Sequence, residues 1–318
     1  MAETDFNTLA GLVQFNDKNL ADLDVSNLLQ KAPLLEVLTT VPASNGTSHK
    51  YLVETGASSS AFREALNGIT KTGSKDTLVT DTLKILDGSF DCDIALADAY
   101  KDGRDAYLQK ELMRTMRQVF ANVEKQIFYG VGGTGDSGGF PGLVDNTQLA
   151  SIAATMVINA GGATADKQTS CFLLNHGVDN VALVLGNDGN IVVEDEPSII
   201  QHAGADSGTY PALFVAVTGY SGFQIGGAYS AGRIANIDTN DLTSTSAFTD
   251  VHLMTALSKF PGGAGPNVIC MNRNAQLLLW SSRTAVNPTG APASTPVEFM
   301  GIPIIITDQI ASTEAVET

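Results

Sequence analysis

The chain has 318 residues, of which 43% are hydrophobic, 16% are charged and 31 are glycine. This composition predicts a folded, turn-rich protein of about two domains and excludes an intrinsically disordered chain. The formal net charge of −16 argues against a protein that grips nucleic acid through its overall field. Because copies of so acidic a chain repel one another, any assembly must bury surface to overcome that repulsion.

The three cysteines, Cys92, Cys171 and Cys270, are widely spaced and form no Cys-x-x-Cys pair. We expect small buried side chains in a reducing compartment, with no disulfide framework, no metal and no cofactor. The first residues lack the basic segment of a secretory signal, so we expect an intracellular, soluble protein at synthesis. The longest uncharged run, 207–232, is broken by glycines; we predict β-structure there and no contact with a membrane.

The first third of the chain is predicted to be extended. Residues 1–48 contain two prolines and no sustained period, which is typical of an arm. The segments HKYLVETG (49–56) and TLVTDTLKILDGSFDCDIAL (77–96) are strand-like and flank a polar tract, so they predict a long β-hairpin. The hairpin has too few apolar residues for a core of its own, and we expect it to rest on another subunit.

The segment 103–130 is the strongest helix prediction in the chain. One apolar face is formed by residues that recur every three or four positions: Leu108, Leu112, Met116, Val119, Val123 and Ile127. Met113 and Phe120 are expected to lie beside this face and widen it. Asp102 is predicted to cap the start and Gly130 to end the helix. About 25 residues at ~1.5 Å each predict a rod of roughly 37 Å.

Strands and turns are predicted to alternate over most of the remaining chain. The candidate strands up to residue 245 are CFLLNHGVDNVALVLG, NIVVED, ALFVAVTG, GFQIGG and GRIANID. TDVHLMTALSKF (249–260) is predicted as a helix, and NVICMN and GIPIIITD (301–308) as strands. No internal repeat is present in the sequence, and the predicted fold class is α+β.

The glycine-rich segment after the long helix raises the question of catalysis. Its pentapeptide 135–139, GDSGG, also surrounds the nucleophilic serine of chymotrypsin-like proteases, and His49, Asp93 and Ser137 follow the triad order. A long helix between Asp93 and Ser137 has no place in a double β-barrel. We therefore predict a turn and no enzyme, with the reversal allowed by Gly130, Gly135, Gly138 and Gly139. A hydrolase using Ser137 is the weakest hypothesis, because the sequence offers it no base.

The order of these parts resembles that of a known family. The tract AFREALNGITKTGS…TLKILDGSFDCDIALAD…YLQKELMRTMRQVFANVEKQIFYG…GGFPGLV is similar to major capsid proteins of tailed bacteriophages, which have the Hong Kong 97-type fold shared with encapsulins. The resemblance implies an N-terminal arm at 1–48, an extended loop at 49–90 and a peripheral domain at 91–164 with a spine helix at 104–128. It further implies an axial domain at 165–265 and a return to the peripheral domain at 266–318.

The resemblance implies a structural role. The chain is expected to self-assemble into pentamers and hexamers of an icosahedral phage head around double-stranded DNA, to form in the bacterial cytoplasm and to reside in the virion. The implied partners are other copies of itself, a separate scaffolding protein, a portal protein, a decoration protein and packaged DNA, which the inner face would contact non-specifically. The alternative is an encapsulin-like compartment that carries a cargo enzyme.

Two groups of residues are expected to serve assembly or packaging. Contacts between subunits are expected from the extended loop, through Phe62, Arg63, Lys71, Lys75 and Lys84. Residues 101–125 carry six positive and four negative side chains, a net +2 in an acidic protein. The basic residues Lys110, Arg114, Arg117 and Lys125 either face packaged DNA or form ordinary pairs on the helix surface, such as Glu111 with Arg114. The sequence favours neither interpretation.

Overall fold

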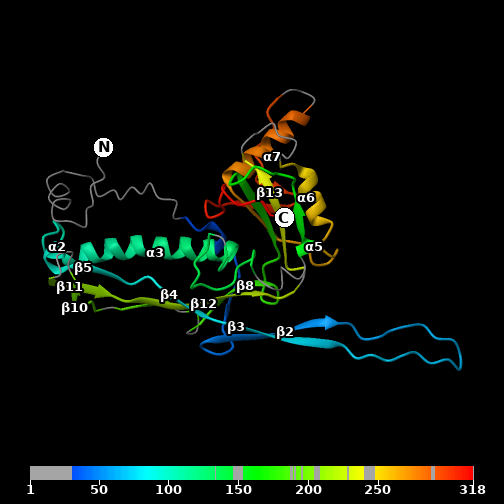
Figure 1. Cartoon of the computed structure of the whole chain (residues 1–318), viewed down its shortest axis with the longest axis horizontal. Coiled ribbons are helices and arrows are strands. Elements are labelled where there is room, and N and C mark those ends of the chain that lie inside the picture. The colour runs from blue at the N-terminus through cyan, green and yellow to red at the C-terminus, as the bar shows by residue number, and fades with distance from the viewer. Residues whose placement is uncertain are drawn as a thin grey trace.

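The computed structural model describes residues 31–132, 134–145, 153–186, 189, 191–194, 196–203, 208–227, 229–239, 248–287 and 291–317. Within these ranges the molecule is flat and extended (Figure 1). A long helix above thin sheets forms the first limb. A second body with its own helices rises beside the end of that helix and forms the second limb, and a hairpin projects away from both. Most of the predicted N-terminal arm, residues 1–30, lies outside the described residues.

The long helix predicted from the apolar period is α3 (Arg104–Tyr129). Val119, Val123 and Ile127 on the predicted face are buried. Met113 and Phe120 do not widen that face, because they are 57% and 40% exposed. At 3.6 residues per turn they lie well round the helix from Val119, so the prediction for these two side chains was wrong.

Both ends of α3 depend on glycine. The N-cap is Gly103 at φ +91 and makes no side-chain capping bond, so the predicted cap at Asp102 is wrong. Asp102 stands one position too early, and its carboxylate lies 3.6 Å from Lys101 Nζ instead. Gly130 ends the helix at φ +63, as predicted, in a backbone conformation that favours glycine.

Two sheets lie beneath α3. One has the order β1 (Thr40–Pro42), β8 (Val181–Leu185), β12 (Val217–Ile225) and β4 (Lys84–Asp87), with β9 (Val192–Val193) also paired to β12. The other has the order β10 (Ser198–Ala203), β11 (Thr209–Val215) and β5 (Phe90–Asp93). Their apolar side chains pack with the first half of α3 in one buried cluster.

The strand-like run at 77–96 is divided among several elements. It contributes to β3 (Lys75–Thr82), then supplies β4, β5 and the short helix α2 (Ile94–Asp98), and the three strands have different partners. Gly88 lies between β4 and β5 where the chain passes under α3. A Cβ there would stand 2.5 Å from Val119 Cγ2, so the close approach of strand and helix requires glycine.

The second body is built on a six-stranded sheet. Its order is β15 (Glu298–Phe299), β16 (Ile302–Ile306), β14 (Val268–Met271), β7 (Gln168–Leu174), β13 (Ala231–Asp238) and β6 (Val157–Asn159). The short helix α5 (Ala153–Met156) precedes β6, and α6 (Asp250–Leu257) and α7 (Arg273–Val286) pack on the sheet. Alternate residues of β7 reach different cores: Cys171 and Leu173 join the cluster with α6 and α7, whereas Phe172 and Leu174 face α3.

Strand pairing divides the chain differently from the predicted domain boundaries. Residues 181–225 supply strands to the sheets under α3, whereas β14 and β16, at 268–306, pair in one sheet with β7. All four residues of β14 are buried, so the strand needs a neighbour on each side, and it has β7 and β16. Helix α7 was not predicted, although Asn272 caps it by accepting a bond from Ala275 N at 2.8 Å.

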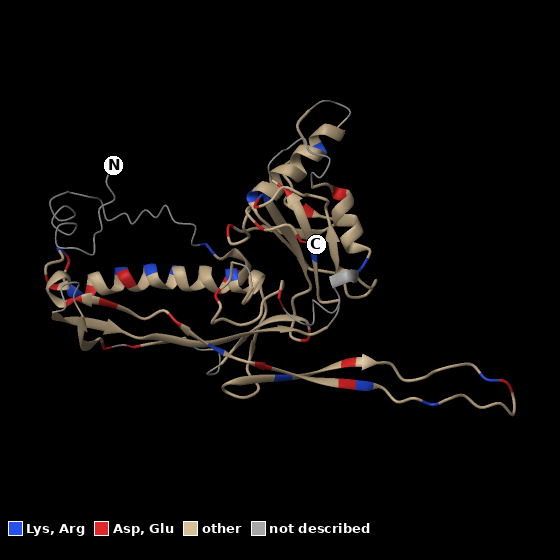
Figure 2. Cartoon of the chain, in the orientation of Figure 1, with Lys and Arg blue, Asp and Glu red and all other residues tan. Residues whose placement is uncertain are grey.

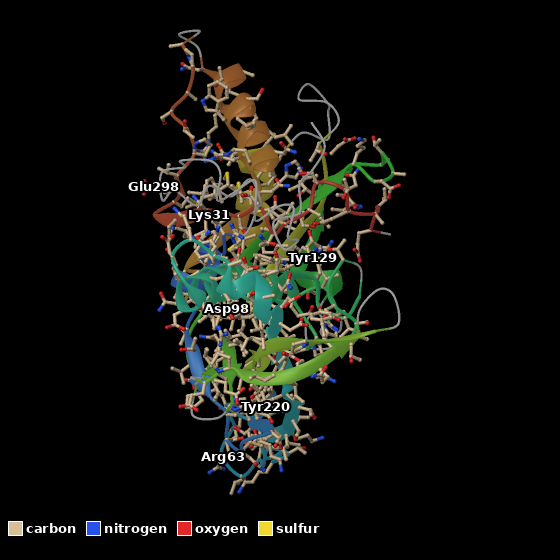
Figure 3. The ribbon with its side chains drawn as sticks, turned by 90° about the vertical axis from the view of Figure 1, so that its left-hand side faces the viewer. Lys31, Arg63, Asp98, Tyr129, Tyr220 and Glu298 are labelled. Carbon is tan, nitrogen blue, oxygen red and sulfur yellow. The ribbon has the colours of Figure 1, made fainter. Side chains whose placement is uncertain are left out.

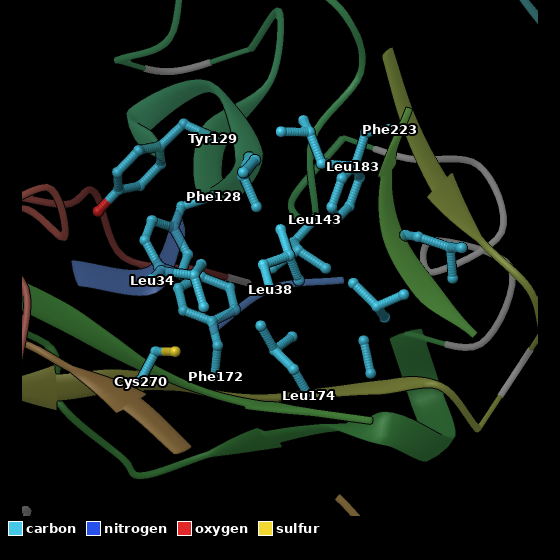
Figure 4. Packing of buried hydrophobic residues seen from close by; sticks show 14 of the residues in the cluster. Leu34, Leu38, Phe128, Tyr129, Leu143, Phe172, Leu174, Leu183, Phe223 and Cys270 are labelled. Atoms are coloured by element: carbon cyan, nitrogen blue, oxygen red, sulfur yellow. The ribbon is translucent and has the colours of Figure 1, made fainter. Parts of the chain in front are cut away.

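One apolar cluster joins the two limbs (Figure 4). Leu34 comes from the short 3-10 helix η1 (Pro33–Glu36), Phe128 from the end of α3, Phe172 from β7 and Phe223 from β12. The rings of Phe128 and Phe172 lie 5.1 Å apart. Burial of each large side chain stabilises the fold by about 1.5–3 kcal/mol. The corner between the limbs is therefore a packed core.

Candidate functional site

The extended hairpin has no core beneath it. Strands β2 (Ser48–Gly56) and β3 pair antiparallel, and residues 57–74, all of them described, carry neither helix nor strand. At the tip Phe62 and Leu66 are completely exposed, at 107% and 102%. Arg63 lies on the far side of the sheets from Glu298 in the view along α3 (Figure 3). The hairpin thus presents apolar and basic side chains away from its own subunit.

The base of the hairpin is fixed to β12 by polar contacts. His49 is 7% exposed; its Nδ1 accepts a bond from Ser44 N at 3.3 Å, and its Nε2 lies 2.8 Å from Gln224 Oε1. Because Nδ1 accepts, the proton sits on Nε2, which donates to Gln224. Tyr51 Oη donates to the Ile225 carbonyl at 3.1 Å. These bonds set the direction in which the hairpin leaves the body.

The residues predicted for the extended loop lie in two different parts of the structure, the hairpin and the sheet under α3. Phe62, Arg63 and Lys71 lie in the tip, and Lys75 begins β3. Lys84 instead lies in β4 opposite Ser221 of β12, so it belongs to the sheet under α3. The sequence did not separate these positions because β3 and β4 follow each other without a turn signal.

Two side chains hold the glycine loop that follows α3. Gln126 Oε1 accepts from Asp136 N at 2.7 Å, and its Nε2 donates to the carbonyls of Asp136 (3.1 Å) and Phe140 (2.7 Å). Asp145 accepts from the backbone N–H groups of Val131 and Gly132 at 2.5 and 2.9 Å, and of Gly142 at 2.6 Å. These two residues satisfy four backbone N–H groups of the loop, and Asp136 accepts from Gly138 N and Gly139 N, so the loop is a well-bonded turn.

The predicted turn glycines differ in how strictly they are required. Gly130 has φ +63, a Cβ at Gly135 would lie 1.8 Å from the Gly130 carbonyl oxygen, and a Cβ at Gly139 would lie 2.3 Å from Gln126 Nε2. At Gly138 the nearest atom would be 3.5 Å away, which is ordinary contact. Three of the four positions therefore require glycine, and Gly138 has room for a side chain.

His49, Asp93 and Ser137, the residues of the protease hypothesis, do not form a triad. Both ring nitrogens of His49 are engaged by Ser44 and Gln224, and Asp93 caps α2 by accepting from Ala95 N at 2.8 Å. Ser137 is exposed in the loop held by Gln126. The GDSGG sequence is explained by turn geometry.

The basic residues of α3 do not form one uniform patch (Figure 2). Arg114 Nη1 lies 2.9 Å from Glu111 Oε1, which is the helix-surface pair anticipated from the spacing. Lys110 Nζ lies 5.8 Å from the centre of the Tyr100 ring. Arg117 and Lys125 are half-buried. The sequence interpretation of ordinary pairing therefore fits Arg114.

Two buried ionic groups were not recognised from the sequence. Glu124 on α3 is fully buried; it accepts from Leu34 N at 2.9 Å and from the Thr307 hydroxyl, and burial raises its pKa to about 7. It thereby ties η1 and the segment after β16 to the long helix. In the sequence Glu124 is indistinguishable from an exposed helix charge.

The second buried group is Arg233 on β13, which holds the C-terminal segment. Arg233 bonds Ser170 Oγ at 3.0 Å and lies 3.2 Å from a Glu314 oxygen and 2.9 Å from a Glu317 oxygen. Tyr129 Oη donates to Glu314 at 2.6 Å, and burial, together with the proximity of that carboxylate, raises the pKa of the tyrosine. The one sequence signal available for this site, a lone arginine within an apolar strand, was not recognised.

Neither a metal site nor a membrane-spanning helix is found in the described ranges. Across them, no three His, Cys, Asp or Glu side chains come together in a way that suits a metal ion. Among the helices described, none combines the length and apolar character needed to cross a membrane.

The limbs, the long helix and the projecting hairpin define a class of protein: the capsid proteins with the Hong Kong 97-type fold. The structure of the capsid protein of bacteriophage Epsilon15 matches with a TM-score of 0.69 and 22% identity, over 97% of this chain and 96% of that chain. The bacteriophage JBD30 capsid matches with a TM-score of 0.48 and 11% identity, over 93% and 98% of the two chains. The SrpI encapsulin of Synechococcus elongatus PCC 7942 matches with a TM-score of 0.47 and 11% identity, over 76% and 98%.

The chain belongs to the family of the major capsid protein GP7, whose model matches residues 17–317. It is therefore a major capsid protein of the tailed-phage type, and its function is to form the capsid shell of the virion. The encapsulin alternative is not favoured, since the family match is to phage capsid proteins. No curated protein sequence matches the chain.

Proposed function

We propose that this chain assembles into the pentamers and hexamers of an icosahedral phage head that encloses double-stranded DNA. The observation that carries the proposal is the extended hairpin, whose tip leaves Phe62 and Leu66 fully exposed. Burying a side chain of either kind contributes about 1.5–3 kcal/mol. A hairpin without a core gains that energy only against another subunit, so the hairpin supplies contacts in trans.

The two limbs have separate roles in the proposed shell. The body around the six-stranded sheet acts as the axial domain, and the limb with α3 acts as the peripheral domain. Phe62, Arg63, Lys71 and Lys75 on the hairpin contact neighbouring subunits. Lys84 acts only through the sheet that it helps to form, because it lies in β4.

The proposed partners follow from assembly around DNA in the bacterial cytoplasm. A separate scaffolding protein guides the shell, a portal protein occupies one vertex, and a decoration protein binds the outside. DNA contacts on the inner face are non-specific, and the net charge of −16 keeps them weak. The chain acts as a structural protein and not as an enzyme; the engagement of His49 and Asp93 by other groups supports this.

Negative-stain electron microscopy tests the proposal most directly. The wild-type protein, expressed with its scaffolding protein, is expected to form closed shells. The double variant Phe62→Ser/Leu66→Ser is expected to remain as folded subunits or open capsomers, whereas Ser60→Ala at the same tip assembles normally. Closed shells from the double variant would refute the role of the tip. Discrete wild-type monomers under every condition would refute the assembly proposal itself.

A further inference from the structure

One face of α3 lies away from the sheets. It is formed by residues at successive intervals of four or three positions: Ala106, Lys110, Met113, Arg117, Phe120 and Glu124. We call these six residues the upper stripe. Met113 and Phe120 are exposed within it, whereas Leu108, which packs with the sheets, and Val119, which lies against Gly88 below the helix, are buried. The stripe thus combines two exposed apolar side chains with two basic ones.

The described chain already lies on one end of the upper stripe. Leu34 N donates to Glu124 Oε2 at 2.9 Å. This bond holds η1 against Glu124, the last residue of the stripe. In Figure 3, which looks along α3, Lys31 lies above the helix and Tyr220 of β12 lies below it. Residue 31 therefore reaches α3 on the side of the upper stripe.

We infer that residues 17–30 of the same chain dock along the upper stripe from Phe120 toward Lys110. Their reach is sufficient. The fourteen positions from Glu124 to Lys110 span about 21 Å at ~1.5 Å per helical residue. Fourteen residues of extended chain span up to roughly 46–50 Å.

The chemistry of the segment complements the stripe. Residues 17–30 contain one lysine, Lys18, and three acids, Asp17, Asp22 and Asp24, so their side chains sum to 1 − 3 = −2. Leu20 and Leu23 alternate with the acids nearest to Lys31. Leucines match the exposed Met113 and Phe120, and aspartates match Lys110 and Arg117.

The same chemistry favours a peptide over DNA as the occupant. A DNA backbone is held by Lys and Arg contacts that release counterions, and it gains nothing from an exposed methionine and phenylalanine. Two of the four basic residues considered as DNA-facing, Arg114 and Lys125, lie to one side of the upper stripe, because they fall between its positions. Occupation by residues 17–30 buries the apolar pair and brings aspartates beside Lys110 and Arg117.

Photo-crosslinking of the full-length protein tests the inference. Benzoylphenylalanine at position 120 is expected to crosslink to peptides from residues 17–30, identified by mass spectrometry of unassembled subunits and of filled particles. The same probe at Val251, which is 66% exposed on α6, is the matched control and should not reach these peptides. Crosslinks from position 120 to DNA, to other parts of the chain or to nothing would overturn the inference.

A mixture of 15N-labelled and unlabelled chains identifies the source of the segment. Crosslinks within one isotope support docking by the same chain, whereas crosslinks found solely between isotopes would overturn it. Hydrogen exchange supplies a second readout: Arg117→Glu should speed exchange of the 17–30 amides roughly fivefold. Adding Asp24→Arg should restore most of the protection. Unchanged exchange in both variants would also overturn the inference.

Discussion

Replacing Glu124 by glutamine isolates the effect of an ionisable carboxyl buried where the limbs join. Burial raises its pKa from the ordinary 4.5 to about 7, so the folded subunit keeps a proton that the unfolded chain releases near pH 4.5. Between these values the unfolded state binds fewer protons, and the free energy of unfolding falls as pH rises. At about 1.4 kcal/mol per pH unit, the loss from Glu124 reaches about 3 kcal/mol above neutral pH.

Urea unfolding of the unassembled subunit measures this loss. A glutamine at 124 does not ionise, and its amide oxygen still accepts from Leu34 N. Relative to wild type, Glu124→Gln should therefore gain about 3 kcal/mol between about pH 4 and about pH 8.5. Glu64→Gln, in the exposed hairpin tip, serves as the control and should follow the wild-type profile. Parallel profiles for wild type and Glu124→Gln would refute the reasoning.

Three further substitutions test other parts of the structure. Gln126→Ala removes three bonds to the glycine loop and should lower the free energy of unfolding by about 2–3 kcal/mol in urea titrations. Arg233→Gln leaves the Glu314 carboxylate buried without its cation; we expect a loss of about 3–5 kcal/mol and faster proteolysis of the C-terminal segment. Gly88→Ala places a Cβ 2.5 Å from Val119, and calorimetry should show a loss of about 1–3 kcal/mol.

Each of these substitutions has a control in the same chain. Gln109→Ala on the exposed surface of α3 and Gly46→Ala, where nothing lies within 4 Å, should change stability by less than about 0.5 kcal/mol. Arg104→Gln breaks an exposed pair with Asp98 and should leave proteolysis of the C-terminal segment unchanged. Equal effects in test and control variants would contradict the roles assigned to Gln126, Gly88 and Arg233.

Sequence patterns within one segment were sufficient to predict the elements that form within that segment: the long helix, the hairpin and the turn after the helix. The apolar period runs from Leu108 to Ile127 within the 26-residue helix α3, and Gly130 at the end of the helix has the positive φ that a terminating glycine provides. The hairpin was visible as two alternating runs around a polar tract. The turn after α3 was predicted because the preceding helix excluded a catalytic explanation of its glycines.

The pairing of strands that are far apart in the sequence could not be predicted in the same way. Nothing near β14 indicates that its neighbours are β7, almost a hundred residues earlier, and β16. Met113 and Phe120 were predicted to extend the apolar face because the sequence does not distinguish an apolar side chain that is buried in the core from one that is exposed. Glu124 and Arg233 read as surface charges, since their partners Leu34, Thr307 and Glu314 are far away in the sequence.

The position of β16 also constrains when the protein can fold during synthesis. β16 pairs with β14, and Thr307 directly after it bonds Glu124, so both the second body and the join between the limbs stay incomplete until Thr307 has emerged from the ribosome. Sheets with such distant pairings form slowly. A growing polypeptide that has not yet exposed Thr307 therefore lacks the finished surfaces that assembly needs.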